Sequence, residues 1–367
     1  MTGAHLDERI ARRPAVVSPG PHPGHDPGAW YTSPELLREE RRALFDRSWA
    51  LVGTVEQVAE VGAYVTATVG LSPLVVVRSP GGALRAFHNL CPHRGLALVE
   101  GSGTCGRYLT CPYHQWSFDT DGTLRRIPQS EEQFADVDVT GLGLHPASVD
   151  TWHGMVFANP DPHAPPLRQA LGELGRRLEH FVDGPMVEVA SVTYEVSCNW
   201  KLIVENHVDV YHLWFVHRRS LAAYDHRSFS WELLGDNWWS FEPQKDPAGL
   251  RDEALPWLDA SEYLGIGASL LFPNLMIVTT NRYFATYDAV PVAPDRTRLT
   301  LRVRSTEDRD GHGLVGAVRS FLAEDITVCE RLQTSVASPR FGLGPLAATH
   351  ELPIVRFHQA VARACHG

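Results

Sequence analysis

The chain has 367 residues, of which 44% are hydrophobic and 21% are charged, as is typical of a soluble globular protein with room for two domains. Its formal net charge of −10 argues against nucleic acid or an anionic membrane as the main partner, and it holds no run of about 18 apolar residues that could span a bilayer. Because the N-terminus also lacks the apolar stretch of a signal peptide, we expect a cytoplasmic location, where the six cysteines bind metal or are buried rather than forming disulfides.

The first 48 residues predict an arm followed by a helix. Residues 1–30 are rich in Pro, Gly and His, which predicts a mobile segment. A helix start follows, with Ser33 suited to the N-cap, Pro34 to the first helical position and Glu35 to the first turn. We expect residues 1–48 to pack, as arm and helix, on the C-terminal domain.

Residues 49–159 predict a small all-β domain. Short apolar or alternating runs at 63–69, 74–78 and 84–88 are typical of strands, and Gly81-Gly82 predicts a hairpin turn between the last two. The Pro-rich stretch ANPDPHAPPL marks the end of this domain.

Residues 160–367 predict a second domain that mixes helices with an antiparallel sheet. Helical patterns cover residues 167–181, 199–215 and 313–333, and strand patterns cover residues 187–196, 275–292 and 297–306. The last two strand runs pair plausibly around a turn at Pro294-Asp295. The expected fold class is therefore α+β, with an all-β domain preceding a domain of antiparallel sheet and helices.

Two Cys/His pairs stand inside the all-β domain. Cys91-x-His93 is followed, after seventeen residues, by Cys111-x-x-His114. Four such ligands suit a tetrahedral zinc or an iron–sulfur cluster. In a Rieske [2Fe–2S] cluster both cysteines hold one iron and both histidines hold the other, so each loop must supply one of each, as it does here. A structural zinc site, whose pairs usually contain one kind of ligand, is the alternative.

A second histidine pair lies in the stretch ENHVDVYHLWFVH. His212 and His217 are five residues apart, which on a regular helix places their side chains about 140° apart rather than the about 40° of a four-residue spacing. Two histidines and one carboxylate on an iron leave positions open for dioxygen and substrate, and such an iron would consume the electrons that a Rieske cluster relays. We therefore hypothesise that both bind iron and that the helix loosens or ends near residues 213–216. Ordinary packing of the two rings is the alternative.

The whole chain resembles the large (α) subunit of Rieske non-haem iron oxygenases. The resemblance runs from WYTSPELLREERRALFDRSW to the long closing helix. The family motif N-W-K … E-N … D-x-x-H-x4-H matches Asn199, Trp200, Lys201, Glu205, Asn206, Asp209, His212 and His217. It implies a Rieske domain at residues 49–159 and a catalytic domain of the helix-grip, StAR-related type at residues 160–367.

The resemblance also implies roles for single residues. The third iron ligand is expected to be Asp325, with its neighbour Glu324 as the alternative. Asp209 is expected to bridge His212 to the second Rieske histidine of a neighbouring subunit, in a homo-oligomer such as a trimer or a pair of trimers. Asn206 is expected near the iron.

The implied function is the use of O2 and electrons to hydroxylate a C–H bond of a small organic substrate. Monooxygenation or oxidative N-demethylation of a small amine or betaine-like compound is the first expectation, and aromatic-ring dihydroxylation is the alternative. Because the chain shows neither a nucleotide-binding glycine fingerprint nor a second Cys-rich ferredoxin segment, we expect a separate NAD(P)H-dependent reductase, with or without a ferredoxin. A Rieske electron carrier without its own catalysis and a zinc-stabilised structural protein are the alternatives from other classes.

An aromatic-rich stretch at residues 224–272 is the candidate substrate region. Its aromatic side chains could wall a pocket for an aromatic ring or enclose a quaternary ammonium by cation–π attraction. The candidates are Trp231, Trp238, Trp239, Phe241 and Tyr263.

Overall fold

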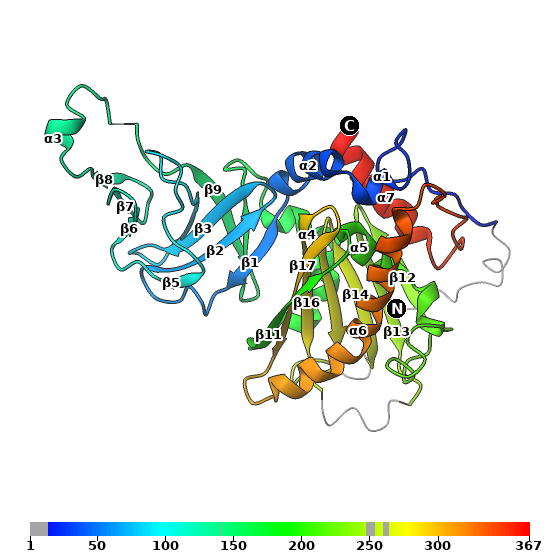
Figure 1. Ribbon diagram of the computed structural model, residues 1–367. Coiled ribbons are helices and arrows are strands. Elements are labelled where there is room, and N and C mark those ends of the chain that lie inside the picture. The colour runs from blue at the N-terminus through cyan, green and yellow to red at the C-terminus, as the bar shows by residue number, and fades with distance from the viewer. Residues whose placement is uncertain (1–13, 140, 247–253, 260–263) are drawn as a thin grey trace. The chain divides into compact units, whose positions relative to one another are not determined.

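The chain divides into two compact units (Figure 1). One unit comprises Arg41–Ala170, and the other combines Met1–Glu40 with Leu171–Gly367. Among the described residues, no helix has both the length and the apolar character needed to cross a membrane. The structure is a computed structural model that describes residues 14–139, 141–246, 254–259 and 264–367.

The first unit is built on two antiparallel sheets. The larger has seven strands in the order β1-β10-β9-β4-β3-β2-β5, and the smaller has three in the order β6-β7-β8. This arrangement confirms the prediction of an all-β domain, to which two short helices, η2 (Phe45–Arg47) and α3 (Ser130–Gln133), are added. The strands are β1 (Ala50–Thr54), β2 (Ala63–Val69), β3 (Ser72–Arg78), β4 (Leu84–His88), β5 (Ser102–Thr104), β6 (Tyr108–Thr110), β7 (Ser117–Asp119), β8 (Leu124–Arg126), β9 (Pro146–Trp152) and β10 (Met155–Asn159).

Strand β3 carries core residues on both of its faces. Val75 belongs to the same buried cluster as Cys91 and Cys111, whereas Val76 belongs to a second buried cluster. A strand that is buried on both faces requires a continuous apolar run rather than an alternating one, which explains the sequence LVVV. The thiols of the Cys/His motif are therefore buried in the core of this unit.

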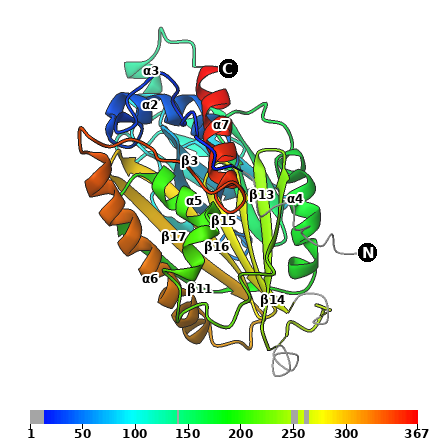
Figure 2. The same cartoon turned by 90° about the vertical axis from the view of Figure 1, so that its right-hand side faces the viewer.

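The second unit is a seven-stranded antiparallel sheet with helices packed against it. The strand order is β11-β17-β16-β15-β14-β13-β12. Figure 2 shows α5 and α6 in front of the sheet, where α5 contacts β14 and β16, and α6 contacts β11 and β17. This confirms the predicted antiparallel sheet with helices. The strands are β11 (Val187–Val196), β12 (Ser230–Leu234), β13 (Asn237–Pro243), β14 (Gly265–Leu271), β15 (Leu275–Thr280), β16 (Phe284–Ala293) and β17 (Arg296–Ser305). The helices in or bordering the unit are α1 (Ala29–Thr32), α2 (Pro34–Ala43), α4 (Leu167–Val182), α5 (Trp200–Val208), η3 (Tyr211–Trp214), α6 (Gly311–Val336) and α7 (Leu352–His366).

Helix α2 begins where the sequence predicts. Pro34 is its first residue, a position where the missing N–H of proline costs no helical hydrogen bond. The Oγ of Ser33 accepts a hydrogen bond from the N–H of Leu36 at 3.2 Å, as an N-cap residue does.

The prediction of a mobile arm is wrong for residues 14–30. Val16 forms a β-bridge with Leu346, and His22 is fully buried with its Nε2 2.7 Å from Glu40 Oε1. The composition of the segment gives no hint of these contacts because its partners lie elsewhere in the chain. Residues 1–13 lie outside the described residues.

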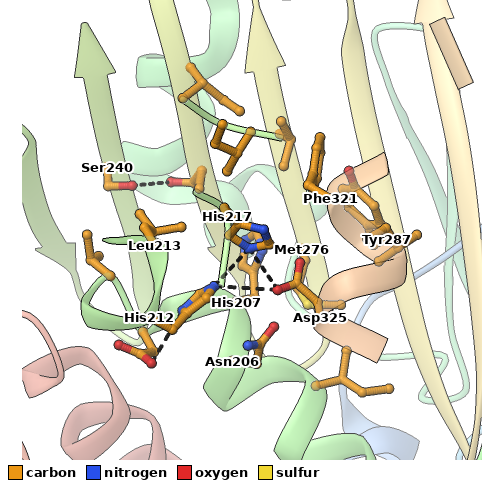
Figure 3. A pocket seen from close by; sticks show the side chains of 18 of the residues that line it. Asn206, His207, His212, Leu213, His217, Ser240, Met276, Tyr287, Phe321 and Asp325 are labelled. Atoms are coloured by element: carbon orange, nitrogen blue, oxygen red, sulfur yellow. Dashed lines mark hydrogen bonds and ion pairs between the residues drawn. The ribbon is translucent and has the colours of Figure 1, made fainter. Parts of the chain in front are cut away.

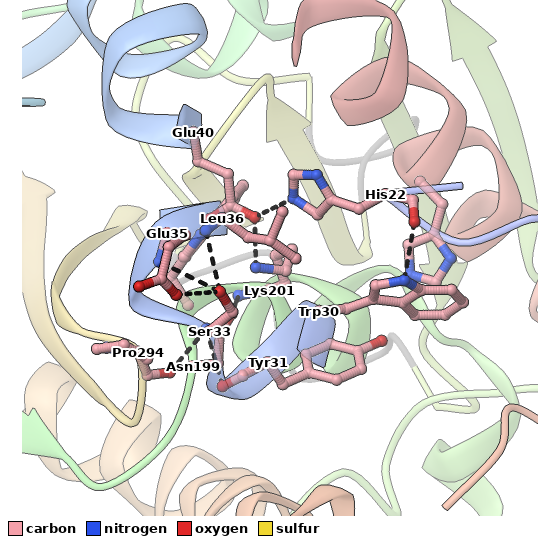
Figure 4. Close-up of polar contacts among 12 residues, drawn as sticks. His22, Trp30, Tyr31, Ser33, Glu35, Leu36, Glu40, Asn199, Lys201 and Pro294 are labelled. Carbon is pink, nitrogen blue, oxygen red and sulfur yellow. Dashed lines mark hydrogen bonds and ion pairs between the residues drawn. The ribbon is translucent and has the colours of Figure 1, made fainter. Parts of the chain in front are cut away.

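A buried ion pair joins α2 to α5 (Figure 4). Lys201 Nζ lies 2.6 Å from Glu40 Oε1, and Trp200 Nε1 donates to Glu40 Oε2 at 2.7 Å. The side chains of the pair are 1% and 0% exposed. Although burial disfavours the charged form, Lys201 and the hydrogen bond from His22 lower the pKa of Glu40 below its ordinary value. The Lys of the N-W-K motif is thus a structural partner of the N-terminal helix.

Lys201→Met should lower the free energy of unfolding by about 3–5 kcal/mol, because it removes the lysine that pairs with the buried charge of Glu40. Urea denaturation followed by tryptophan fluorescence would measure the change. Lys245→Met, at an exposed lysine, is the matched control and should change stability by about 0.5 kcal/mol or less. A loss of less than about 1 kcal/mol for Lys201→Met would contradict a paired role for this lysine.

Glu205 is the centre of a second buried network, on the same helix α5. Tyr31 Oη donates to its two carboxylate oxygens at 3.1 and 3.2 Å, and His358 Nε2 lies 2.9 Å from Oε1. Ser18 Oγ in turn lies 2.7 Å from His358 Nδ1. Residues near both ends of the described chain therefore meet on α5, one helical turn before Asp209.

Candidate functional site

The two Cys/His loops have the same backbone hydrogen-bond pattern. The N–H of Cys91 donates to Leu96 O and its carbonyl accepts from Gly95 N, both at 2.8 Å. The N–H of Cys111 donates to Trp116 O at 2.8 Å and its carbonyl accepts from Gln115 N at 3.0 Å. The two pairs are thus presented by matching turns, as a shared ligand requires.

The residue four positions after the cysteine of each turn has a left-handed backbone conformation. Gly95 has a φ of 77° and Gln115 a φ of 59°. Glycine adopts this conformation without steric cost, whereas a glutamine there is strained and persists because the surrounding structure holds it. The strain is one sign that the geometry of the second loop is tightly constrained.

The side chains of these loops form a suitable donor set for an iron–sulfur cluster. Cys91 and Cys111 are buried, and burial, followed by a hydrogen bond with Cys111, raises the pKa of the Cys91 thiol. The rings of His93 and His114 lie with centroids 4.6 Å apart, and His93 Nδ1 is buried without a hydrogen-bond partner. Two adjacent thiols and two adjacent imidazoles, one with an unpartnered ring nitrogen, fit the ligand pattern of a Rieske cluster.

In the second unit the structure brings His212, His217 and Asp325 together (Figure 3). The two Nε2 atoms are 3.1 Å apart, and Asp325 Oδ1 lies 2.9 Å from His217 Nε2 and 3.4 Å from His212 Nε2. Asp325 Oδ1 is buried without a hydrogen-bond partner of good geometry. Two imidazole nitrogens and one carboxylate oxygen that converge in this way fit a two-histidine, one-carboxylate iron site.

The electrostatics of this cluster favour a cation. Burial opposes protonation of His212, but the nearby carboxylates of Asp209 and Asp325 outweigh it and raise the pKa of His212 to about 10. Burial likewise opposes ionisation of Asp325, whereas the two histidines lower its pKa below the ordinary value. A site that stabilises positive charge so strongly suits a divalent metal ion.

The backbone between the two histidines is not a regular helix. Helix α5 ends at Val208, and Asp209 is extended, with φ −76° and ψ 118°. Asp209 Oδ1 accepts from the N–H of Tyr211 at 2.6 Å, a local turn that competes with helix continuation, and the 3-10 turn η3 then carries His212. The predicted interruption exists, since the 3-10 turn that carries His212 ends at Trp214, but the chain also leaves the α-helix earlier than predicted, at Asp209.

The structure separates the roles of Asp325 and Glu324. Glu324 Oε2 lies 2.8 Å from His217 Nδ1, the ring nitrogen that faces away from Asp325, and also accepts from Ser220 Oγ. From this position Glu324 can hold the ring in the orientation that presents His217 Nε2, whereas Asp325 lies on the Nε2 side of the ring. Asp209 Oδ2 lies 3.3 Å from His212 Nδ1, which is an ion-pair distance without the geometry of a hydrogen bond.

A cavity of about 90 Å³ adjoins the cluster. Its wall is formed by α5, the residues after it, α6 and the inner face of the sheet, and it is mostly apolar, with Met276, Val278 and Phe321 among the lining residues. Asn206 also lines it, beside the cluster (Figure 3). His207 lines it as well, but burial lowers its pKa to about 4 and its Nε2 lies 2.9 Å from Ser269 O, so it is a neutral hydrogen-bonded ring.

Of the candidate pocket aromatics, the structure brings Trp238 to the cavity. Trp239 and Phe241 were wrong candidates, because alternate residues of β13 point to opposite faces and these two lie on the outer one. There the Trp239 ring lies 5.0 Å from the guanidinium carbon of Arg177 on α4. Trp231 was also a wrong candidate: it lies on the edge strand β12 and does not reach the lining. Tyr263 lies outside the described residues.

Glu242, His226 and Tyr287 belong to the site region but were missed in the sequence. Glu242 and Tyr287 line the cavity, and His226 contacts Glu242. The alternation of Trp238, Ser240 and Glu242 along β13 was the one signal available, because it assigns all three to one face.

Comparison with known proteins agrees with this architecture. Residues 184–367 match the family model "ring hydroxylating alpha subunit (catalytic domain)", and residues 48–146 match "Rieske [2Fe-2S] domain". The chain therefore belongs to the family of Rieske-type ring-hydroxylating oxygenase α subunits, whose two domains carry a Rieske [2Fe-2S] cluster and a mononuclear iron. This excludes a zinc-stabilised structural protein and a Rieske carrier without a catalytic domain.

Its relatives include subunits of enzymes that are named for different substrates. The chain is 34% identical over 188 residues to the carnitine monooxygenase oxygenase subunit of Acinetobacter pittii (strain PHEA-2), covering 51% of this chain and 50% of that protein. It is 34% identical over 187 residues to the biphenyl 2,3-dioxygenase subunit alpha of Rhodococcus jostii (strain RHA1), covering 50% and 41%. The alignments thus span about half the length of these curated relatives.

Solved structures extend the likeness in fold over nearly the whole chain. The quaternary ammonium Rieske monooxygenase CntA in complex with gamma-butyrobetaine superposes with a TM-score of 0.77 and 25% identity, covering 92% of this chain and 94% of that one.

Proposed function

We propose that the protein is the oxygenase component of a Rieske monooxygenase that hydroxylates a C–H bond of a small amine or betaine-like substrate, including by oxidative N-demethylation. The observation that carries the proposal is the convergence of His212, His217 and Asp325 beside an apolar cavity, in a chain that also holds a complete Rieske ligand set. Dihydroxylation of an aromatic ring is the second candidate, since the similarity to a biphenyl dioxygenase subunit is equally high.

In this proposal the two ligand sets have separate duties. Cys91, Cys111, His93 and His114 hold the cluster, and His212, His217 and Asp325 hold the iron. Together the two centres supply electron transfer and O2 activation when bound. Glu324 fixes the His217 ring through Nδ1, and Asp209 fixes the His212 ring through its Nδ1.

The cavity supplies what hydroxylation of an unactivated carbon needs from the protein. Its apolar wall excludes water and holds the substrate carbon close to the ligand cluster. Asn206 offers a neutral amide to a polar group beside the cluster. The reaction would thus be directed by position rather than by an acid or base of the protein.

The proposed partners follow from what one chain contains. Electrons come from a separate NAD(P)H-dependent reductase, with or without a ferredoxin, in the cytoplasm. The protein is proposed to work as a homo-oligomer, a trimer or a pair of trimers, in which Asp209 links His212 to His114 of the partner subunit. The carboxylate of Asp209 is suited to this role because it is partly exposed while already in contact with His212.

Oxygen uptake by the holoprotein with a surrogate NADH-ferredoxin reductase system would test the function. The panel would comprise betaines, N-methyl amines, benzoates and biphenyl, with products analysed by mass spectrometry under ¹⁸O₂. We expect amine-dependent uptake with one labelled oxygen atom in the oxygenated product, or formaldehyde after demethylation. A doubly labelled diol from an arene would favour the second candidate, and no substrate-dependent uptake in the panel would contradict both.

A further inference from the structure

Glu242 is a buried carboxylate in the cavity wall that has no part in the roles proposed above. It lies on β13, on the same face as Trp238 and Ser240, because alternate residues of a strand share a face. The residue is 6% exposed and lines the cavity. A carboxylate in this position is costly, because ionised groups lose their hydration when they are buried.

His226 orients this carboxylate. Its Nδ1 lies 2.5 Å from Glu242 Oε2, and His226 is itself 8% exposed. The segment that carries it is fixed alongside the end of β13, since Asp225 N donates to Pro243 O at 2.8 Å and Lys245 N donates to Ala223 O at 2.9 Å. The position of the carboxylate is therefore determined by the fold rather than by a flexible loop.

The contact with His226 does not use all the capacity of the carboxylate. A carboxylate has about four lone-pair sites on two oxygens, so a second donor or a cation can approach from the cavity.

The charge balance of the cavity points to a cationic ligand. Among the described residues that line it, the acidic ones are Asp209, Glu242 and Asp325, and none is lysine or arginine. Asp209 and Asp325 are engaged by the two histidines of the ligand cluster. Glu242 thus places negative charge in the cavity wall. It is remote in sequence from the proposed metal ligands. A cavity for a neutral hydrocarbon gains nothing from such a group, whereas a positively charged ligand would offset its burial.

Neighbouring side chains suit the rest of such a ligand. Trp238 and Phe321 present aromatic rings to the cavity, which attract alkylated ammonium groups. Trp238 Nε1 and Tyr287 Oη are buried donors without a hydrogen-bond partner. Burial raises the pKa of Tyr287 well above its ordinary value, so the hydroxyl keeps its proton and can donate to an oxygen of the ligand.

We propose that Glu242, oriented by His226, recognises the positively charged nitrogen of the substrate and makes the cavity selective for cationic amines over neutral compounds of the same shape. The proposal rests on the proposed function in taking this cavity as the substrate site. It adds the residue that makes the cavity selective for a positively charged substrate.

Equilibrium binding to the anaerobic holoprotein, without reductant, tests this directly. The probes are choline and 3,3-dimethylbutan-1-ol, a neutral compound in which carbon replaces the charged nitrogen. Isothermal titration calorimetry should show that the unsubstituted protein prefers choline. Glu242→Gln should weaken choline binding about tenfold or more, while binding of the alcohol changes by less than about twofold.

Two further variants serve as controls for the binding measurement. Glu232→Gln removes an exposed carboxylate that lies on the outer face, opposite Trp239 in the strand register and paired with Arg177, and it should leave both affinities unchanged. Glu242→Asp keeps the charge and should retain a preference for choline at reduced affinity. Iron content and visible absorbance, which Glu242→Gln should leave unchanged, verify that each variant is folded.

The proposal would be overturned if the unsubstituted protein showed no preference for choline, or if Glu242→Gln weakened the binding of both probes equally. Because binding requires no turnover, these outcomes are independent of the test of the proposed function. A retained charge preference without substrate-dependent oxygen uptake would overturn the proposed function and leave the role of Glu242 standing.

Discussion

Asp325→Ala should abolish substrate oxygenation and lower the iron content from about three atoms per protomer to about two. Asp325 supplies the carboxylate oxygen nearest to both His217 Nε2 and His212 Nε2, so its removal takes away one of the three proposed protein ligands. The Cys/His set lies in the other unit, so the cluster and its visible absorbance should remain. Elemental analysis, absorbance and product formation would be measured on the same preparation.

Glu324→Gln is the matched control, because it changes the adjacent carboxylate on the same helix. It should keep the third iron and lower activity by about 10- to 100-fold, since Glu324 contacts the His217 ring through Nδ1. The reverse pattern, with iron lost in Glu324→Gln and kept in Asp325→Ala, would assign the ligand to Glu324 instead.

Asp209→Asn should leave all the iron in place and lower coupled turnover by about 10- to 100-fold or more. The carboxylate contacts His212 Nδ1 and fixes the turn through Tyr211, and asparagine can keep the turn while losing the charge. Steady-state oxygen uptake and the reoxidation rate of a chemically reduced cluster would be compared with those of the unsubstituted protein.

Glu324→Gln again distinguishes the possible causes. Both variants remove a carboxylate from the Nδ1 side of a proposed iron-binding histidine, but only Asp209 is proposed to link two subunits. Cluster reoxidation should therefore slow in Asp209→Asn and not in Glu324→Gln. Equal effects in both would reduce Asp209 to a residue that orients His212.

The fold was predictable where local patterns decide it. Gly81 and Gly82 have φ of 104° and 84° in the hairpin between β3 and β4, as the sequence predicts. The five-residue spacing of His212 and His217 correctly indicated that the backbone between them is not a plain helix. The earlier end of α5 at Val208 was not predicted, because it depends on two contacts that the spacing does not contain: the Asp209 turn and the hydrogen bond from Val210 N to His350 O at 3.0 Å.

The convergence of His212, His217 and Asp325 was predictable from the sequence, whereas the walls of the cavity were poorly predictable. Motif spacing identified the histidines, but adjacent Asp325 and Glu324 could be separated only when each was seen against a different nitrogen of His217. The pocket candidates were chosen by aromatic composition, which ignores the pleat, so Trp239 and Phe241 were assigned to the wrong face. The partner of Glu242 could not be found either, because the contact with His226 joins a connecting segment to a strand.

The network around Glu205 has a practical consequence for handling the protein. Tyr31 and His358 hold this carboxylate from segments 174 and 153 residues away, one turn of α5 before Asp209. Shortened versions of the chain that omit α7 would remove the His358 contact from this buried acid beside the proposed electron path. Expression tags and fusions are therefore best joined through long linkers, so that neither the segment that carries Tyr31 nor helix α7 is displaced from Glu205.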